Sequence, residues 1–204
     1  MAIATDPRVR RAEPDRIRRP AGRTTNDPLF TRQWGLTRAR FTDAWTMTTG
    51  STEIIVAILD TGIATVSQTP TGEPLPAPRP HPDLEGRLLP GYDFITRTTS
   101  SGDGDGRDAD PTDAGDVNTS RLHGTHVAGI LGANANNRLG ITGTDWSCRI
   151  LPVRVAGKCG AALSDIIDGM RWAAGLPVAG VPANAHPARI VNISFGGSNL
   201  CGSA

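Results

Sequence analysis

The sequence predicts an α/β fold with a parallel sheet. The segments 53–60, 148–155 and 189–195 are apolar and rich in β-branched residues, as expected of strands buried on both faces of such a sheet. Helical patterns at 122–133 and 164–174 lie between these strands, and strand–helix alternation is typical of α/β proteins. Because only 4% of the residues are aromatic, we expect a core of Ala, Val, Ile and Leu.

An arm is expected to precede the domain. Residues 1–28 are charged and interrupted by prolines, with seven arginines between Arg8 and Arg23. Asn26-Asp27-Pro28 is a turn signal, and an amphipathic stretch follows it and ends at Gly50. We therefore expect residues 1–25 to be an appendage and the domain to begin at residue 26.

Two long segments have the composition of surface loops. Residues 64–82 contain six prolines and show no periodicity, which indicates an insertion. Residues 102–116 contain six aspartates and four glycines, and they lack the spacing of an EF-hand calcium loop. We expect both segments to be exposed to solvent.

Two predictions concern the ends and faces of elements. Pro152, in the second strand, is expected at an edge or an end, because proline cannot donate a hydrogen bond to a strand ladder. Ser164 is expected to cap the following helix, in which Ile166, Ile167, Met170 and Ala174 are predicted to share one apolar face.

Composition excludes several classes of partner. The formal net charge of +1 gives no reason to expect binding to nucleic acid or to an anionic membrane. No apolar run approaches the roughly 18–20 residues of a membrane span, and no signal-peptide stretch follows Met1. Cys148, Cys159 and Cys201 form no C-x-x-C pair, which argues against zinc. One disulfide with one free thiol, or three reduced thiols, both remain open.

An acid and an imidazole are the candidate catalytic groups. Asp60 ends the first strand and His123 begins a helix, and functional groups of parallel sheets gather beyond the carboxyl ends of the strands. A carboxylate that accepts the imidazole N–H fixes the tautomer and stabilises the imidazolium. The spacing alone also fits a turn aspartate and a structural histidine. A zinc protease is disfavoured, because His123 and His126 are three residues apart, not four, and the glutamate of His-Glu-x-x-His is missing.

The sequence motifs around these residues resemble those of the subtilisin-like serine proteases, or subtilases. Ile55-Val-Ala-Ile-Leu-Asp60-Thr-Gly-Ile resembles their aspartate motif, and His123-Gly-Thr-His-Val-Ala-Gly resembles their histidine motif. Weaker matches are Val191-Asn-Ile-Ser-Phe-Gly-Gly197, His81-Pro-Asp-Leu84 and Trp34-Gly-Leu with Ala44-Trp45. Aspartate before histidine is also the order seen in subtilisin. The resemblance covers residues 26–204.

The resemblance implies a three-layer, parallel-sheet, subtilisin-like fold and a serine endopeptidase acting on protein or peptide substrates through an acyl-enzyme. Asp60 would orient His123, the general base and acid. Substrate backbone would pair with a cleft segment made of Ser194, Phe195, Gly196 and Gly197. The family's Gly-Thr-Ser-Met-Ala segment does not occur in the 204 residues, so we expect it beyond Ala204, the fold to be incomplete, and this chain alone to be inactive.

Two other functions were weighed against the protease. A subtilase-like binding or structural domain without catalysis is the alternative, and the intact Asp60 and His123 argue against it. A nucleotide-binding protein is disfavoured, because the first strand leads into Asp60-Thr-Gly rather than a Gly-x-Gly-x-x-Gly turn.

The resemblance also implies a structural calcium ion, a disulfide and a propeptide. The expected calcium ligands are Asp27, Asp83, Ala135, Asn137, Leu139 and Ile141. Cys159 and Cys201 match positions that are paired in a bacterial extracellular branch of the family, which implies secretion and leaves Cys148 free. Residues 6–16 resemble the last strand of the inhibitory propeptide, so residues 1–25 would be its C-terminal end plus a maturation linker, and the propeptide would be a partner.

Overall fold

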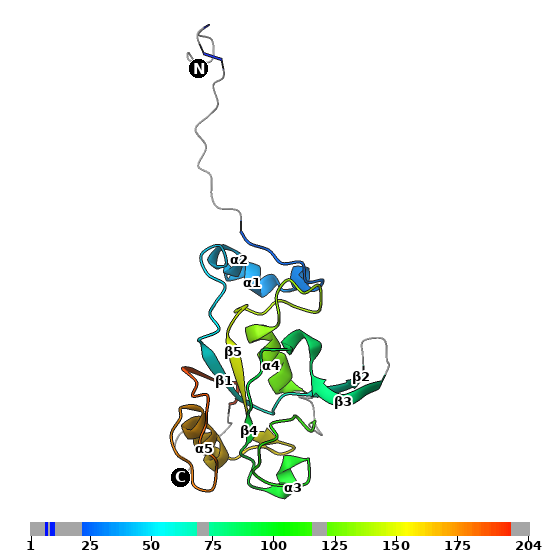
Figure 1. Ribbon diagram of the computed structural model, residues 1–204, viewed down its shortest axis with the longest axis vertical. Coiled ribbons are helices and arrows are strands. Elements are labelled where there is room, and N and C mark those ends of the chain that lie inside the picture. The colour runs from blue at the N-terminus through cyan, green and yellow to red at the C-terminus, as the bar shows by residue number, and fades with distance from the viewer. Residues whose placement is uncertain (1–6, 8, 11–21, 69–73, 116–121, 197–204) are drawn as a thin grey trace.

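A computed structural model of the chain, shown in Figure 1, describes residues 7, 9–10, 22–68, 74–115 and 122–196. Its centre is a sheet of four parallel strands in the order β4-β5-β1-β8. The strands are β1 (Ile55–Asp60), β4 (Tyr92–Asp93), β5 (Arg149–Arg154) and β8 (Ile190–Ile193). The predicted parallel sheet is therefore confirmed, with each long strand inside its expected segment.

Two helices cover opposite faces of this sheet (Figure 1). Helix α4 (His123–Gly132) packs through Ala128 on the face that carries Ile58 and Ile150. Helix α5 (Leu163–Ala173) packs through Trp172 on the other face, with Ala57, Leu59 and Val153. Successive residues of β1 point to opposite faces, so an uninterrupted apolar run fills both cores. The structure has three layers, as expected.

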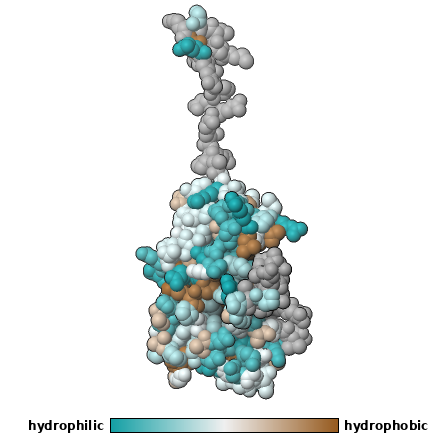
Figure 2. All heavy atoms as spheres, turned by 45° about the vertical axis from the view of Figure 1, so that its right-hand side comes forward, coloured by the Kyte–Doolittle hydropathy of each residue, from teal (hydrophilic) through white to brown (hydrophobic). Residues whose placement is uncertain are grey.

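Short elements surround the three layers. They are η2 (Phe30–Arg32), α1 (Trp34–Arg38), α2 (Phe41–Ala44), η3 (Pro82–Leu84), α3 (Thr98–Ser101), β6 (Ala156–Gly157) and β7 (Gly160–Ala161). Trp45, almost fully buried, contacts the rings of Phe30, Phe41 and Trp146 and fixes the N-terminal helices on the domain. Figure 2 shows the surface as a mosaic in which small apolar patches lie between polar side chains. None of the helices in the described ranges is long and apolar enough to cross a bilayer.

The described end of the N-terminal arm lies on the domain. The Arg23 N–H donates to the Thr42 carbonyl at 2.7 Å, and the Arg23 guanidinium lies 4.6 Å from the ring centre of Trp146. The hydroxyls of Thr25 and Thr142 are 2.6 Å apart. Contact with the domain therefore begins a few residues before the predicted boundary at residue 26.

The proline-rich insertion is a hairpin rather than an irregular loop. Strand β2 (Thr65–Gln68) pairs antiparallel with β3 (Pro74–Pro80). In β3 every second residue is proline, and alternate backbone N–H groups of a strand point to opposite edges. The missing donors therefore all lie on one edge, and the other edge is free to pair with β2.

Pro152 was expected at an edge or an end, but it lies inside β5 and pairs with Ile58. The Ile150 N–H points to the β4 side, where it donates to the Arg87 carbonyl, so the nitrogen of Pro152 faces the same side. Strand β4 starts only at Tyr92, opposite Val153. The nitrogen of Pro152 thus faces a stretch where β5 is not paired with β4, so β4 needs no N–H donor from this residue.

The expected start of α5 was wrong, and its expected apolar face was right only at Ile166, which packs against the core. The helix begins at Leu163, and Ala162, not Ser164, is the N-cap residue. The other members of the predicted face, Ile167, Met170 and Ala174, are exposed, whereas Asp165, Gly169 and Trp172 are buried. A Cβ on Gly169 would lie 2.8 Å from Val155, so this glycine lets the helix approach the sheet closely and sets its rotation.

Candidate active site

The structure brings Asp60 and His123 together at the carboxyl edge of the sheet. His123 Nδ1 lies 2.8 Å from Asp60 Oδ1. The Asp60 side chain is 1% exposed and the His123 side chain 35%, so the acid is buried while the imidazole is open to solvent. An ionised carboxylate only accepts hydrogen bonds, so Nδ1 is the donor and Nε2 can accept a proton. This is the orienting arrangement expected from the sequence.

Hydrogen bonds between backbone N–H groups and threonine hydroxyls hold the start of α4 against the end of β1. The Gly124 N–H donates to Thr61 Oγ1 at 3.0 Å, and the Ala64 N–H donates to Thr125 Oγ1 at 2.7 Å. The Thr61 N–H also donates to Asp60 Oδ1 at 2.8 Å. Gly124 and Thr125 are therefore tied to the turn that follows Asp60, and His123 contacts Asp60 itself, so the imidazole is positioned by three consecutive residues of the helix.

Two glycines allow this close approach. A Cβ on Gly124 would lie 2.2 Å from the carbonyl oxygen of Gly62, which is far inside van der Waals contact. Gly62 has a φ of +99°, and a Cβ there would lie 2.4 Å from the Pro111 carbonyl oxygen. Glycine at both positions is a steric requirement of the site.

The predicted cleft segment begins beside the pair. Ile193 pairs with Leu59, so the next residue, Ser194, follows at the level of Asp60. Ser194 Oγ accepts a hydrogen bond from Asn192 Nδ2 at 2.9 Å and borders a cavity of about 290 Å³ between α4 and β8. Phe195 and Gly196 are exposed, as a surface that receives another backbone must be. Gly197 lies outside the described residues.

Comparison with known proteins now decides the family. A profile of the subtilase family matches residues 51–204, three quarters of the chain. The chain belongs to the subtilase family. The sequence is 41% identical to an extracellular protease of Xanthomonas campestris over 98% of this chain and 34% of that protein. It is 37% identical to an extracellular basic protease of Dichelobacter nodosus, again over 98% of this chain and 34% of that protein.

Among solved structures, a protease from Pseudoalteromonas arctica matches with a TM-score of 0.75 and 42% identity. The match covers 88% of this chain and 53% of that one. The subtilisin-like fold predicted from the sequence is thus confirmed for the part described. This subtilase chain spans about a third of the length of the two curated relatives named.

The expected calcium ligands are two acids, Asp27 and Asp83, and residues of the tight loop 135–141 that follows α4. Asp27 is buried, and its carboxylate accepts the N–H groups of Asn136 and Asn137 and the Thr142 hydroxyl, at 3.0, 3.1 and 2.6 Å. Asp83 accepts Asn137 Nδ2 at 2.7 Å and the Ile141 N–H at 3.1 Å. Both acids therefore hold this loop through hydrogen bonds.

These residues fit a calcium ion unequally. Burial raises the pKa of Asp83, although the Asn137 and Ile141 hydrogen bonds act in the opposite direction. A cation would relieve this burial penalty, and the adjacent amide of Asn137 offers a second oxygen of the kind that calcium prefers. Both oxygens of Asp27 and both oxygens of Asp83 already accept hydrogen bonds from the loop, three at Asp27 and two at Asp83. The Asn137 oxygen accepts the Leu139 N–H. Asp83 therefore fits a cation better than Asp27, and a bound ion would replace hydrogen bonds that Asp83 and Asn137 now accept.

The cysteines differ in their surroundings. Cys148 is fully buried, and burial raises the pKa of its thiol to about 11, which makes it unreactive. Cys159 is exposed. Its predicted partner, Cys201, lies outside the described residues, so the disulfide stays a prediction.

Sequence reasoning missed a buried arginine beside the Asp60–His123 pair. Arg154 is directly opposite Asp60 in the β1–β5 register, and its guanidinium contacts the carboxylates of Asp93 and Asp103 and the Ser101 carbonyl. Burial raises the pKa of Asp93 to about 6 in spite of Arg154. For Asp103 burial also acts upward, but hydrogen bonds from Ser101 and the Asp105 N–H, together with Arg154, lower the pKa to about 2.

The pKa values of the two carboxylates that contact Arg154 thus shift in opposite directions, upward for Asp93 and downward for Asp103. One arginine charge is shared by two acids, and Asp103 is partly exposed while Asp93 is not. We assign the ionised partner of Arg154 primarily to Asp103, because solvent stabilises its charge. The sequence offered one signal for this cluster, a charged residue, Arg154, directly after the apolar run Ile150–Val153.

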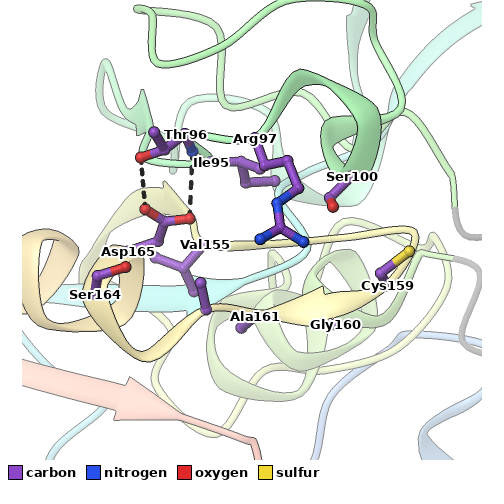
Figure 3. Close-up of a pocket in the computed structure, with 11 residues that line it drawn as sticks. Ile95, Thr96, Arg97, Ser100, Val155, Cys159, Gly160, Ala161, Ser164 and Asp165 are labelled. Atoms are coloured by element: carbon purple, nitrogen blue, oxygen red, sulfur yellow. Dashed lines mark hydrogen bonds between the residues drawn. The ribbon is translucent and has the colours of Figure 1, made fainter.

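A cavity of about 380 Å³ opens at the same edge of the sheet, between the segment after β4 and the start of α5 (Figure 3). Val155 borders it and donates its N–H to the Asp60 carbonyl at 2.9 Å. Thr96 closes one side through two hydrogen bonds to Asp165, from its N–H at 3.2 Å and its hydroxyl at 2.8 Å. Arg97 points toward the cavity in Figure 3. No pattern in the sequence indicated this cavity.

Proposed function

We propose that this subtilase chain is the Asp–His part of a serine endopeptidase. The observation that carries the proposal is the 2.8 Å contact between a buried carboxylate, Asp60, and a solvent-open imidazole, His123. The relatives of Xanthomonas campestris and Dichelobacter nodosus, both named extracellular proteases, support the reaction class. The serine nucleophile would come from a Gly-Thr-Ser-Met-Ala segment, which the 204 residues do not contain.

The contact between His123 and Asp60 supports the following proton transfers. His123 Nε2 removes the proton of the serine hydroxyl as its oxygen attacks the carbonyl carbon of the peptide. The resulting imidazolium carries its second proton on Nδ1, hydrogen-bonded to Asp60, whose negative charge stabilises it. The imidazolium then gives its Nε2 proton to the leaving amine, and the acyl-enzyme forms. Water then attacks the acyl-enzyme in the same way. His123 Nε2 takes the proton of the water and passes it to the serine oxygen as the acid product leaves, which restores neutral His123.

Substrates of this protease would be extended polypeptides. The segment Ser194–Gly196 follows β8, the outermost strand of the sheet within the described residues, and its backbone groups would pair with an extended substrate as an added strand. Since Ser194 is level with Asp60, a peptide bound there would pass the imidazole. The 204 residues thus supply one wall of a cleft and the proton-transfer group.

Calcium, secretion and a propeptide complete the proposal. Asp83 and Asn137, with the carbonyls of Ala135, Leu139 and Ile141, would hold one calcium ion that stiffens the loop after α4. The names of the relatives support an extracellular protein. Residues 1–25 would be the end of an inhibitory propeptide and its linker, which is removed on maturation.

The test uses two forms of the protein. The 204-residue chain alone should hydrolyse no peptide and bind no serine-directed fluorophosphonate. Fused to the C-terminal part of the catalytic domain of the Xanthomonas campestris relative, it should turn over a peptide substrate. In the fusion, Asp60→Asn should lower kcat by about 10⁴-fold, because the asparagine favours the wrong imidazole tautomer.

Asp43→Asn is the matched control, since Asp43 forms an exposed ion pair with Arg40, 2.8 Å long, away from the sheet edge. It should leave kcat unchanged. Full activity of the Asp60→Asn fusion would favour the alternative, a binding domain whose Asp60–His123 pair has no catalytic role. Turnover by the 204-residue chain alone would contradict the assignment of the serine to a segment outside it.

A further inference from the structure

The loop before α4 contains a buried carboxylate that the proposed reaction does not use. Asp113 is 8% exposed, and both of its oxygens accept hydrogen bonds. Oδ2 accepts from the Thr61 hydroxyl at 2.6 Å, and Oδ1 accepts from the Gly115 N–H at 2.8 Å. Its backbone is bound as well: the Asp113 N–H donates to the Ile63 carbonyl at 3.1 Å. Asp113 is therefore fixed against the turn that follows Asp60.

Thr61 links this carboxylate to both members of the catalytic pair. Its N–H donates to Asp60 Oδ1, and its hydroxyl oxygen accepts the N–H of Gly124, the residue after His123. A hydroxyl has one proton to donate and lone pairs that accept. Because Asp113 takes the proton, the lone pairs of Thr61 Oγ1 remain directed to the helix.

We infer that Asp113 is a positioning residue for the Asp60–His123 pair, acting through the Thr61 hydroxyl, which its carboxylate holds in the orientation that accepts the Gly124 N–H. The inference rests on the proposed function, because it deepens the account of the same site. Asp113 touches neither His123 nor a substrate in this arrangement, so the effect of its side chain on the pair passes through Thr61.

Ionised aspartate is the side chain that suits this position. Both Asp113 contacts come from donors, and a carboxylate offers two accepting oxygens. Asparagine has one accepting oxygen and one NH₂ group. If its oxygen stays with the Gly115 N–H, its NH₂ faces Thr61 Oγ1 and competes with Gly124 for the lone pairs.

Asp113→Asn in the 204-residue chain tests this by NMR. Amide exchange at Gly124 should become about tenfold faster, the effect of losing one ordinary hydrogen bond. The ¹⁵N shifts of His123 should change from the single Nδ1–H tautomer to a mixture. Asp110→Asn, an exposed aspartate of the same loop, should change neither quantity.

Thr61 variants identify the route. Thr61→Val should reproduce both effects, Thr61→Ser should cause neither, and Asp113→Asn added to Thr61→Val should have no further effect on Gly124 exchange. Additive effects of the two changes would overturn the inference, since they would mean that Asp113 acts independently of Thr61. Should Asp113→Asn fail to fold, Asp113→Glu, which keeps the charge and displaces the carboxylate, takes its place in the same comparison.

Asp60→Asn separates this inference from the proposed function. If it leaves the His123 tautomer unchanged, the catalytic pairing itself fails. If Asp60→Asn shifts the tautomer while Asp113→Asn changes neither readout, the pairing stands and the positioning role of Asp113 is wrong.

Discussion

Replacing Gly124 by alanine is the sharpest steric test of how His123 is positioned against Asp60. The added Cβ would lie 2.2 Å from the Gly62 carbonyl oxygen and 3.1 Å from the Asp60 Cβ. Asp60 is the last residue of β1, and Gly62 belongs to the turn after it, which backbone hydrogen bonds from Ile63 and Asp113 hold in place. The start of α4 must therefore move away from Asp60.

The magnitude follows from opposing contributions. Alanine in a helix interior is favoured over glycine by about 1 kcal/mol. Overpacking against a backbone atom costs about 1–3 kcal/mol. Movement of the helix also weakens the Gly124–Thr61 and His123–Asp60 hydrogen bonds, each worth roughly 1 kcal/mol net. We expect Gly124→Ala to lower the free energy of unfolding by about 2 kcal/mol.

Gly129→Ala is the matched control within the same helix. Its Cβ would meet only the flexible end of Ile141, at 3.5 Å, which is an ordinary contact. This variant should be more stable than the wild type by up to about 1 kcal/mol. Urea unfolding followed by tryptophan fluorescence measures both variants, and His123 ¹⁵N shifts report the pairing. Equal stability of the two variants would refute the steric explanation.

Three further predictions concern charges. The pKa of Asp103 is lowered from 3.8 to about 2, so its stabilising effect is complete above pH 4 and disappears as the pH falls toward 2. Asp103→Asn should thus lower stability by about 1 kcal/mol at pH 7 and not at pH 2, as urea unfolding at both pH values can show. Arg107→Ala should cost about 2 kcal/mol in urea unfolding, because it leaves the buried Asp165 without its partner at 2.9 Å, whereas Arg40→Ala, in an exposed pair, should cost under about 0.5 kcal/mol. Calcium should raise the melting temperature of the wild type, and Asp83→Asn should abolish that increase; a wild type that melts at one temperature with calcium and with chelator would count against the site.

Much of the site could be predicted because it depends on local sequence. Asp60 ends an uninterrupted apolar strand and His123 begins a helix rich in small residues, so their places at one edge of a parallel sheet follow from strand and helix patterns. The family motifs around them added the pairing itself. The loop at Asn137 and its two acids, Asp27 and Asp83, also lie together as the resemblance implied.

Other features escaped sequence reasoning because they depend on the partner that a residue meets. Pro152 is tolerated inside β5 only because β4 starts too late to need its N–H. The rotation of α5 is set by Gly169 and by Asp165, which binds Thr96, so Ile167 and Met170 are exposed despite their apolar spacing. Hydrophobic periodicity indicates which side chains prefer to be buried. In α5 the close packing of Gly169 against the sheet outweighed that preference.

The sequence by itself determined the class of fold, the order of its strands and helices, and the two residues of the candidate pair, because each is written in a short segment. Only the tertiary structure decided which distant groups support that pair. Asp113 meets Thr61 at a sequence separation of 52 residues, and Arg154 meets Asp93 at a separation of 61. Buried polar groups require partners, and which partner is at hand depends on how the chain folds back, which no local pattern contains.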